Sequence, residues 1–300
     1  VGLIFFVNLL CTAMVTFGFW KELQGFRYKF DAALAKRLLK YTWPLLIFSL
    51  VGILNQVADK MIFPKLMPGD EGRVQLGIYG ACVKVAMIMA LLTQAFRYAY
   101  EPIVFSGSRD KNSPETLSEG MTYFVVFTVL AFLGVMFYMP ILKFLVGSSY
   151  REGLAVVPVV MLAEIFMGIY FNLSFWYKLS DQTHWGAIMS AVGAGTMILV
   201  NILFVPRIGY WACAWGGFAG YGVAMLLCYF IGQKKYPIPY DMKSIGLFVA
   251  LAALLYAASW AIGRFTGFGE ILQMVINTIL ILPYLGLMYI LLWKKRANSI

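Results

Sequence analysis

The sequence predicts an all-α, polytopic helical membrane protein with about nine spans. Its 300 residues are 61% hydrophobic and 13% charged, whereas soluble domains are roughly half apolar and a quarter charged. Apolar runs of about 20 residues, enough to cross ~30 Å of hydrocarbon as a helix, recur along the whole chain. These runs lack the period-two alternation of a transmembrane β-barrel, so helices are the predicted spanning elements.

The first apolar run, "VGLIFFVNLLCTAMVTFGFW", begins at Val1. A signal peptide is the alternative to a span, but the run has no basic leader and no small-residue cleavage site. We therefore expect residues 1–20 to be the last span of an N-terminal lobe that precedes this sequence. By hydropathy windows of roughly 19 residues, the expected spans are 1–20, 43–64, 76–97, 121–142, 154–177, 185–205, 209–232, 245–263 and 271–293.

A basic linker, residues 21–42, follows the first span. Within it Leu34, Leu38 and Tyr41 share one helical face, and Lys36, Arg37 and Lys40 lie toward the other. That pattern is typical of a helix in the headgroup plane; an ordinary basic cytoplasmic loop is the alternative. Residues 43–293 are then expected to form a C-terminal transmembrane lobe with additional helices, and 294–300 a cytoplasmic tail.

The distribution of Lys and Arg predicts the orientation, because basic residues are retained on the cytoplasmic side. One side holds most of them: Lys21, Arg27, Lys29, Lys36, Arg37, Lys40, Arg97, Arg109, Lys111, Lys178, Lys234, Lys235, Lys243, Lys294, Lys295 and Arg296. The other side holds Lys65, Arg73, Lys143, Arg151, Arg207 and Arg264. The C-terminus is therefore predicted to be cytoplasmic. The net charge of +10 lies in loops that face anionic lipid, which argues against nucleic-acid binding.

Polar side chains inside the second and third spans predict a polar cavity. Ionisable residues within spans are costly and normally face a cavity or a partner. Asn55 and Asp59 share one stripe of a helix, and Gln56 and Lys60 form the adjoining stripe. Lys84 lies at a similar depth on the third span, where pairing with Asp59 is feasible. The alternative is a structural ion pair that fixes the register of the helices.

Two further groups are weaker candidates. Glu164 falls near the middle of the fifth span with Asn172 two turns further on, among phenylalanines at helical spacing. We interpret Glu164 and Asn172 as candidate sugar contacts, against the alternative that these rings pack or face lipid. Arg97 and Glu101, four residues apart at the inner end of the third span, form either an interfacial pair or a gate.

Signatures of catalysis and of cofactor binding are missing from the sequence. There is no GxxxxGK[ST] phosphate-binding loop, and the four cysteines have no CxxC pairing. The sole histidine, His184, has no partners at metal-ligand spacing. The expected outer loops are short. We therefore expect no metal, no cofactor and no enzymatic activity.

Three stretches resemble the C-terminal half of bacterial polysaccharide exporters, the Wzx-type O-antigen flippases of the multidrug/oligosaccharidyl-lipid/polysaccharide (MOP) superfamily. The first is a Pro-headed span, "YTWPLLIFSLVGILNQVADKMIFPKLM", with the dipeptide Asp59-Lys60. The second is the Gly77-Ile78-Tyr79 entry to the next span, followed by Lys84 and Pro102. The third is a G-x-x-Y outer turn from Gly147 to Tyr150. Each motif is short and apolar, and the resemblance as a whole spans nearly the entire chain.

The resemblance implies two helical lobes around a cationic cavity and a fourteen-helix protein in the bacterial inner membrane. It implies transport of an undecaprenyl-diphosphate-linked oligosaccharide by alternating access, in lipopolysaccharide O-antigen synthesis. Lys60 and Lys84 would contact the anionic diphosphate or acidic sugars, and Asp59 would orient them. The implied partners are the lipid-linked oligosaccharide, membrane lipids and other glycan-assembly proteins. The alternatives are a drug or cation antiporter of the same superfamily, a membrane-embedded glycan polymerase or ligase, and a non-transporting scaffold.

Overall fold

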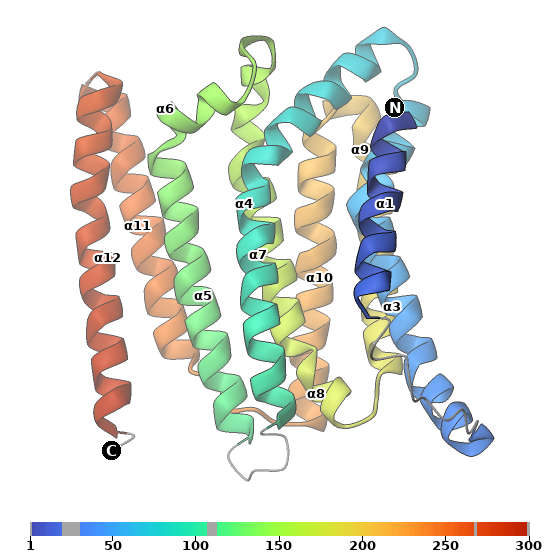
Figure 1. The fold of residues 1–300 in the computed structure, drawn as a ribbon. Coiled ribbons are helices and arrows are strands. Elements are labelled where there is room, and N and C mark those ends of the chain that lie inside the picture. Colours follow the sequence, from blue (N-terminus) through green and yellow to red (C-terminus); the bar gives the residue numbers. More distant parts are fainter. Residues whose placement is uncertain (1, 20–30, 107–112, 267–268, 299–300) are drawn as a thin grey trace. The chain divides into compact units, whose positions relative to one another are not determined.

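The computed structural model describes residues 2–19, 31–106, 113–266 and 269–298, and every regular element in these ranges is a helix (Figure 1). The chain is a polytopic all-α membrane protein, as predicted. Its elements are α1 (Gly2–Gly18), α3 (Ala32–Leu66), α4 (Asp70–Ser106), α5 (Ser113–Phe137), α6 (Met139–Leu142), the 3₁₀ helices η1 (Lys143–Leu145) and η2 (Ser148–Val156), α7 (Val157–Leu173), α8 (Phe175–Leu179), α9 (His184–Ile208), α10 (Trp211–Lys235), α11 (Met242–Thr266) and α12 (Glu270–Asn298).

Seven helical segments of the described chain are long and apolar enough to cross a membrane. They correspond to the expected third to ninth spans and cover Asp70–Ser106, Pro114–Phe137, Ser148–Leu179, His184–Ile208, Trp211–Lys235, Met242–Phe265 and Glu270–Leu291. The expected first span coincides with α1, whose apolar part is shorter, Phe5–Gly18. The expected second span lies within α3, and many side chains of this span, Asn55 and Gln56 among them, are outside the described set.

The chain divides into two compact units, residues 1–42 and 43–300. In the first unit, the Asp31 side chain caps the start of α3, because its Oδ1 accepts hydrogen bonds from the backbone N–H groups of Ala33 (2.9 Å) and Leu34 (3.1 Å). Helix α3 begins at Ala32 and continues through residue 42, so the second half of the predicted linker and the predicted second span share one helix.

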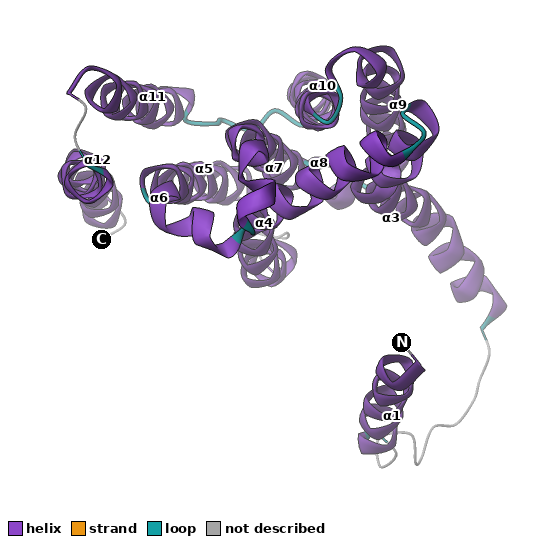
Figure 2. Ribbon diagram, turned by 90° about the horizontal axis from the view of Figure 1, so that it is seen from above, coloured by secondary structure: helices purple, strands orange, loops and turns teal. Residues whose placement is uncertain are grey.

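In the second unit, α7 lies at the centre and contacts α4, α5 and α10 (Figure 2). Helix α9 packs on α10, and α11 and α12 pack on α5 at the opposite side. One buried cluster, which includes Trp176, Tyr177 and Phe124, joins α5, α8 and α11 to their neighbours. A second cluster, which includes Phe63, Cys82 and Met161, joins the end of α3 to α4 and α7. These contacts hold together the five helices that surround the candidate site.

The approach of α9 to α10 depends on glycine. A Cβ atom at Gly193 would lie 2.9 Å from the Gly220 carbonyl oxygen, and one at Gly220 would lie 2.7 Å from the Gly193 carbonyl oxygen. Small residues at these positions let the two backbones meet, which is the usual way in which membrane helices pack closely. Met197, on the same helix as Gly193, is thereby held against α10 at the wall of the site.

Candidate functional site

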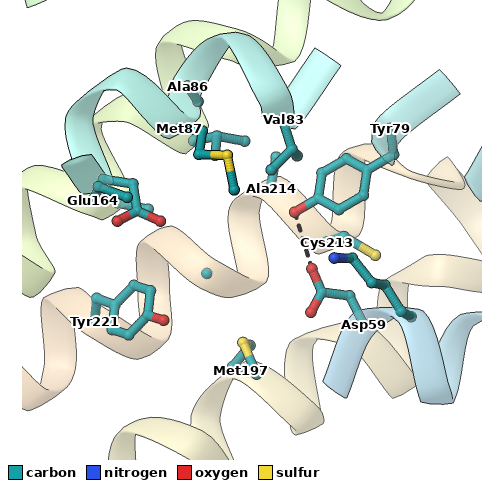
Figure 3. A pocket seen from close by; sticks show the side chains of 15 residues that line it. Asp59, Tyr79, Val83, Ala86, Met87, Glu164, Met197, Cys213, Ala214 and Tyr221 are labelled. Carbon is teal, nitrogen blue, oxygen red and sulfur yellow. Dashed lines mark hydrogen bonds between the residues drawn. The ribbon is translucent and has the colours of Figure 1, made fainter. Parts of the chain in front are cut away.

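An internal cavity of about 220 Å³ lies among α3, α4, α7, α9 and α10. It is lined by two carboxylates, one lysine, two tyrosines and small or apolar side chains (Figure 3). The lining residues are Asp59, Lys60, Tyr79, Val83, Ala86, Met87, Ala90, Val160, Ala163, Glu164, Met197, Cys213, Ala214, Gly217 and Tyr221. Asp59, Lys60 and Glu164, which the sequence indicates on two separate spans, therefore share one cavity.

Asp59 is held in place by a tyrosine of the neighbouring helix. The Tyr79 hydroxyl donates a hydrogen bond of 3.0 Å to Oδ2 of Asp59, which ties α3 to α4 (Figure 3). Oδ1 of Asp59 is buried and has no hydrogen-bond partner among the described residues. A buried acceptor without a donor costs free energy. This oxygen is therefore the atom of Asp59 that is free to receive a proton or a ligand.

Glu164 approaches the same cavity from α7. Its Oε2 atom is also buried without a hydrogen-bond partner among the described residues. Glu164 and Tyr221 lie toward one side of the cavity, and Asp59, Tyr79 and Cys213 lie toward the other (Figure 3). The two carboxylates thus face a shared interior from different helices. Within the described ranges, no group of three or more His, Cys, Asp and Glu side chains is arranged to hold a metal ion.

The two lysines occupy different environments. Lys60 lines the cavity next to Asp59 and is also exposed, so it lies at the edge of the cavity. Lys84 is exposed on α4 and is not among the lining residues. Asp59 and Lys84 do not form an ion pair among the described residues, although their similar depth in the membrane makes such a pair feasible. Depth along a helix does not determine which way a side chain faces, and the rotation of α4 directs Lys84 away from Asp59.

A second group of polar residues, toward the C-terminal ends of α4 and α7, surrounds a cavity of about 10 Å³ that includes Thr93, Arg97 and Asn172. Arg97 lies over the Phe171 ring, with its guanidinium carbon 5.3 Å from the ring centroid. Asn172 is buried, and its Nδ2 donates to the Gly168 carbonyl at 3.0 Å. Nε of Arg97, Oγ1 of Thr93 and Oδ1 of Asn172 have no hydrogen-bond partner among the described residues. Asn172 and Glu164, paired in the sequence interpretation, therefore line different cavities.

An ion pair near the C-terminal end of α4 joins two different helices. Glu101 accepts a hydrogen bond from Nζ of Lys178 at 3.3 Å, which connects α4 to α8. Arg97, the residue that sequence spacing offers as a partner of Glu101, stacks on aromatic rings. Phe175, one of the rings considered for sugar contact, is buried in the core, 5.7 Å from the ring centroid of Tyr100.

Sequence reasoning did not identify three residues of these groups: Tyr79, Tyr221 and Lys178. Tyr79 lies in the Gly77-Ile78-Tyr79 motif, which was considered only for its resemblance. Tyr221 lies in a glycine-rich run, "GGFAGYG", that indicates helix packing. The sequence analysis used Lys178 only as one of the basic residues that predict the orientation. The residues next to it in the sequence do not indicate that it pairs with Glu101. The signal that would have identified Tyr79 is a tyrosine in one span next to a span that carries an acid, here Asp59.

Comparisons with known proteins support the fold. No protein-family model matches the chain, and no curated protein sequence matches it. Two solved structures do. One is the lipid II flippase MurJ in an inward closed conformation, with a TM-score of 0.66 and 18% identity over 92% of this chain. The other is the Vibrio cholerae MATE transporter VcmN in a bent form, with a TM-score of 0.60 and 13% identity over 84% of this chain.

The chain spans 59% of the MurJ structure and 66% of the VcmN structure. At these identities the likeness concerns the three-dimensional arrangement of the helices and not the side chains of a site. The chain has the fold that these two structures share over their matching parts.

Proposed function

We propose that this chain is part of a flippase that moves an undecaprenyl-diphosphate-linked oligosaccharide across the bacterial inner membrane by alternating access. The proposed substrate belongs to lipopolysaccharide O-antigen synthesis, and the proposed partners are that lipid-linked saccharide, membrane lipids and other glycan-assembly proteins. The C-terminus would lie in the cytoplasm. The chain would not be an enzyme.

One observation carries this proposal: 92% of the chain matches the structure of a flippase at a TM-score of 0.66. The sequence motifs around Asp59-Lys60 and Gly77-Ile78-Tyr79 support the same class independently, because they resemble polysaccharide exporters. The second structural match is a transporter as well. A flippase fits both matches and the motifs.

The size of the 220 Å³ cavity limits what it can hold. Pockets for drug-sized ligands measure roughly 300–1,000 Å³, so an oligosaccharide does not fit among these five helices. Water or a small cation does. We therefore assign the saccharide and its diphosphate to the exposed surface of the chain, with Lys60 and Lys84 as the candidate cations, and not to the interior that Glu164 faces.

A second candidate function is ion-coupled antiport, with Asp59 or Glu164 as the proton or Na⁺ site. The observation that favours it is the pair of carboxylates around one small cavity, each with a buried oxygen that lacks a partner among the described residues. The two functions differ in the residues on which they depend. A flippase surface depends on its cations, whereas an antiporter depends on its carboxylates.

The test uses the full-length protein in a flippase-deficient bacterial host. Surface glycan and accumulated cytoplasmic lipid-linked precursor are measured for Lys60→Ala, Lys84→Ala, Asp59→Ala and Glu164→Gln at matched membrane expression. Arg73→Ala is the matched control, because Arg73 is an exposed cation of α4 whose one ion pair within the described residues is with Asp70 of its own helix, 3.3 Å away.

We expect the lysine variants to lose most of the surface glycan and to accumulate precursor, while Arg73→Ala exports normally. Loss confined to Asp59→Ala and Glu164→Gln would instead favour the ion-coupled function. Normal export by all four variants would contradict the assignment of these residues and leave the Asp59 contacts as structural ones.

A further inference from the structure

The segment from α6 into η2, residues 139–151, connects α5 to the next candidate spanning segment, which begins at Ser148 (Figure 1). Three of its exposed side chains are large and apolar: Ile141 is 54% exposed, Phe144 69% and Leu145 74%. The opposite face is anchored, since Val146 is buried in the second cluster. No described part of the chain covers the three exposed apolar side chains.

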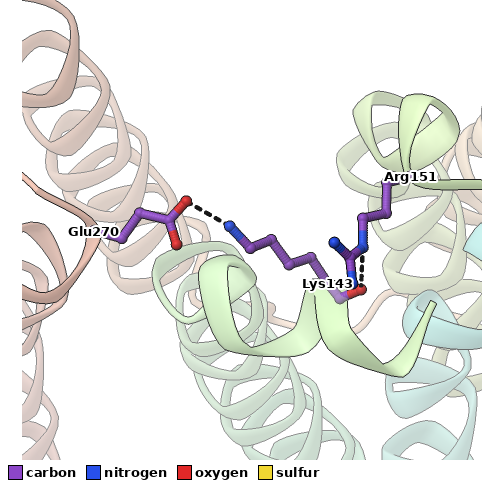
Figure 4. Close-up of polar contacts among 3 residues, drawn as sticks. All are labelled: Lys143, Arg151 and Glu270. Atoms are coloured by element: carbon purple, nitrogen blue, oxygen red, sulfur yellow. Dashed lines mark hydrogen bonds and ion pairs between the residues drawn. The ribbon is translucent and has the colours of Figure 1, made fainter. Parts of the chain in front are cut away.

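Two contacts with helix α12 indicate how deep this segment lies in the membrane. Tyr138, directly before α6, is hydrogen-bonded to Thr278 at 2.7 Å. Lys143, directly after α6, pairs with Glu270 at 2.5 Å (Figure 4). Glu270 begins the spanning helix, and Thr278 lies eight residues deeper, about 12 Å at 1.5 Å per residue. The segment therefore rises from inside the hydrocarbon region to its boundary over α6.

Two cations lie at this boundary, around one exposed aromatic ring. Nζ of Lys143 is 5.5 Å and the guanidinium carbon of Arg151 is 5.1 Å from the centroid of the Phe144 ring. Nε of Arg151 donates to the carbonyl oxygens of Lys143 (3.2 Å) and Val146 (3.3 Å), which fixes the guanidinium over the end of η1 (Figure 4). These bonds use only Nε, so the two terminal amino groups remain for a ligand outside the segment.

We propose that residues 139–151 form an in-plane anchor in one leaflet, in which Ile141, Phe144 and Leu145 enter the acyl boundary and Arg151 binds the phosphate of a phospholipid headgroup. Phe and Leu are typical of the apolar face of a segment that lies in the plane of the membrane interface. Arg matches phosphate geometry with paired donors, and cations at the membrane surface are drawn to anionic lipid. This anchor does not depend on what the protein transports.

Depth is tested by spin labelling of the protein in lipid bilayers. Ile141→Cys and Leu145→Cys are labelled in a background that carries Cys11→Ser, since Cys11 is exposed. These sites leave Phe144 and Arg151 unchanged. The references are Leu199→Cys, exposed in the middle of α9, and Ser149→Cys, exposed in the polar part of the same segment. Collision with oxygen reports the hydrocarbon, and collision with an aqueous nickel chelate reports water.

We expect labels at 141 and 145 to resemble the label at 199, with the 149 label accessible to nickel. Nickel accessibility at 141 and 145 equal to that at 149 would overturn the anchor, because the apolar face would then meet water.

The phosphate site is tested with the same bilayers, made of phosphatidylcholine with a minor fraction of phosphatidylglycerol. Phospholipid retained on the purified protein is weighed by native mass spectrometry. We expect Arg151→Gln to lower the retained phosphatidylglycerol several-fold and Arg73→Gln, which removes an equivalent exposed charge from α4, to leave it unchanged. Equal retention by both variants and the parent would overturn the role of Arg151.

Discussion

The two carboxylate oxygens of Asp59 have different surroundings. One accepts the Tyr79 hydroxyl at 3.0 Å and the other is buried without a described partner. The carboxylate is thus oriented by one neighbour and open on its other side. A substrate contact, an ion site and a structural tie between α3 and α4 all use this arrangement, so the contribution of the tyrosine must be measured separately.

Replacing Tyr79 with Phe removes only the hydroxyl and leaves Oδ2 of Asp59 without its donor. Leaving a buried acceptor unpaired costs about 1–3 kcal/mol, so we expect Tyr79→Phe to lower the free energy of unfolding by about that amount. Thermal unfolding in detergent measures it. Tyr98→Phe is the control, because Tyr98 is 65% exposed on the same helix and should tolerate the change. In the Asp59→Ala background, which has no side-chain acceptor, the effect of Tyr79→Phe should shrink, and an unchanged effect would contradict a direct bond.

At the scale of elements, the wall of the cavity depends on the contact between α9 and α10. The reciprocal positions Gly193 and Gly220 let the backbones meet, and Met197 and Gly217 of the same two helices line the cavity. Any widening of this contact therefore changes the interior that Asp59 and Glu164 share. The spacing of small residues in "GGFAGYG" indicates such packing from sequence, but it does not indicate which helix is the partner.

Gly193→Ala should separate α9 from α10. The added Cβ would lie 2.9 Å from the Gly220 carbonyl oxygen, a backbone atom that cannot move without its helix. Overpacking of this kind costs about 1–3 kcal/mol, and we expect a lower unfolding temperature together with reduced export. Gly195→Ala is a control on the same helix, because nothing lies within 4 Å of its Cβ position. Equal behaviour of the two variants would show that the contact is not tight.

For the whole molecule, the sequence predicts the helices far better than the contacts between them. A spanning helix is a local property, since about 20 apolar residues suffice, and the expected third to ninth spans coincide with α4, α5 and α7 to α12. The partner of a polar side chain is not local. Sequence spacing predicts Arg97 as the ion-pair partner of Glu101, whereas in the structure Glu101 pairs with Lys178 on α8. Equal depth in the membrane predicts Lys84 as a partner of Asp59, whereas in the structure the hydroxyl of Tyr79, on the same helix as Lys84, donates a hydrogen bond to Asp59.

The direction of transport depends on the orientation of the whole molecule, which the basic residues predict. Helix α8, which carries Lys178, lies near the end of α10 that carries Lys234 and Lys235, whereas α6 lies at the opposite end (Figure 1). If the first end is cytoplasmic, the interfacial segment around Phe144 faces outward. An inverted protein would place the same segment in the inner leaflet and reverse the proposed movement of the saccharide.

Cysteine labelling in spheroplasts distinguishes these orientations. Ser149→Cys and Pro237→Cys place single exposed thiols at the two ends of the lobe, again in the Cys11→Ser background. A membrane-impermeant maleimide should react with Cys at 149 directly and at 237 only after the membrane is permeabilised, because the basic loop beside Lys234 and Lys235 is retained in the cytoplasm. The reverse pattern would contradict the charge argument. It would also require that the lysines of the candidate site receive the saccharide from the outer side.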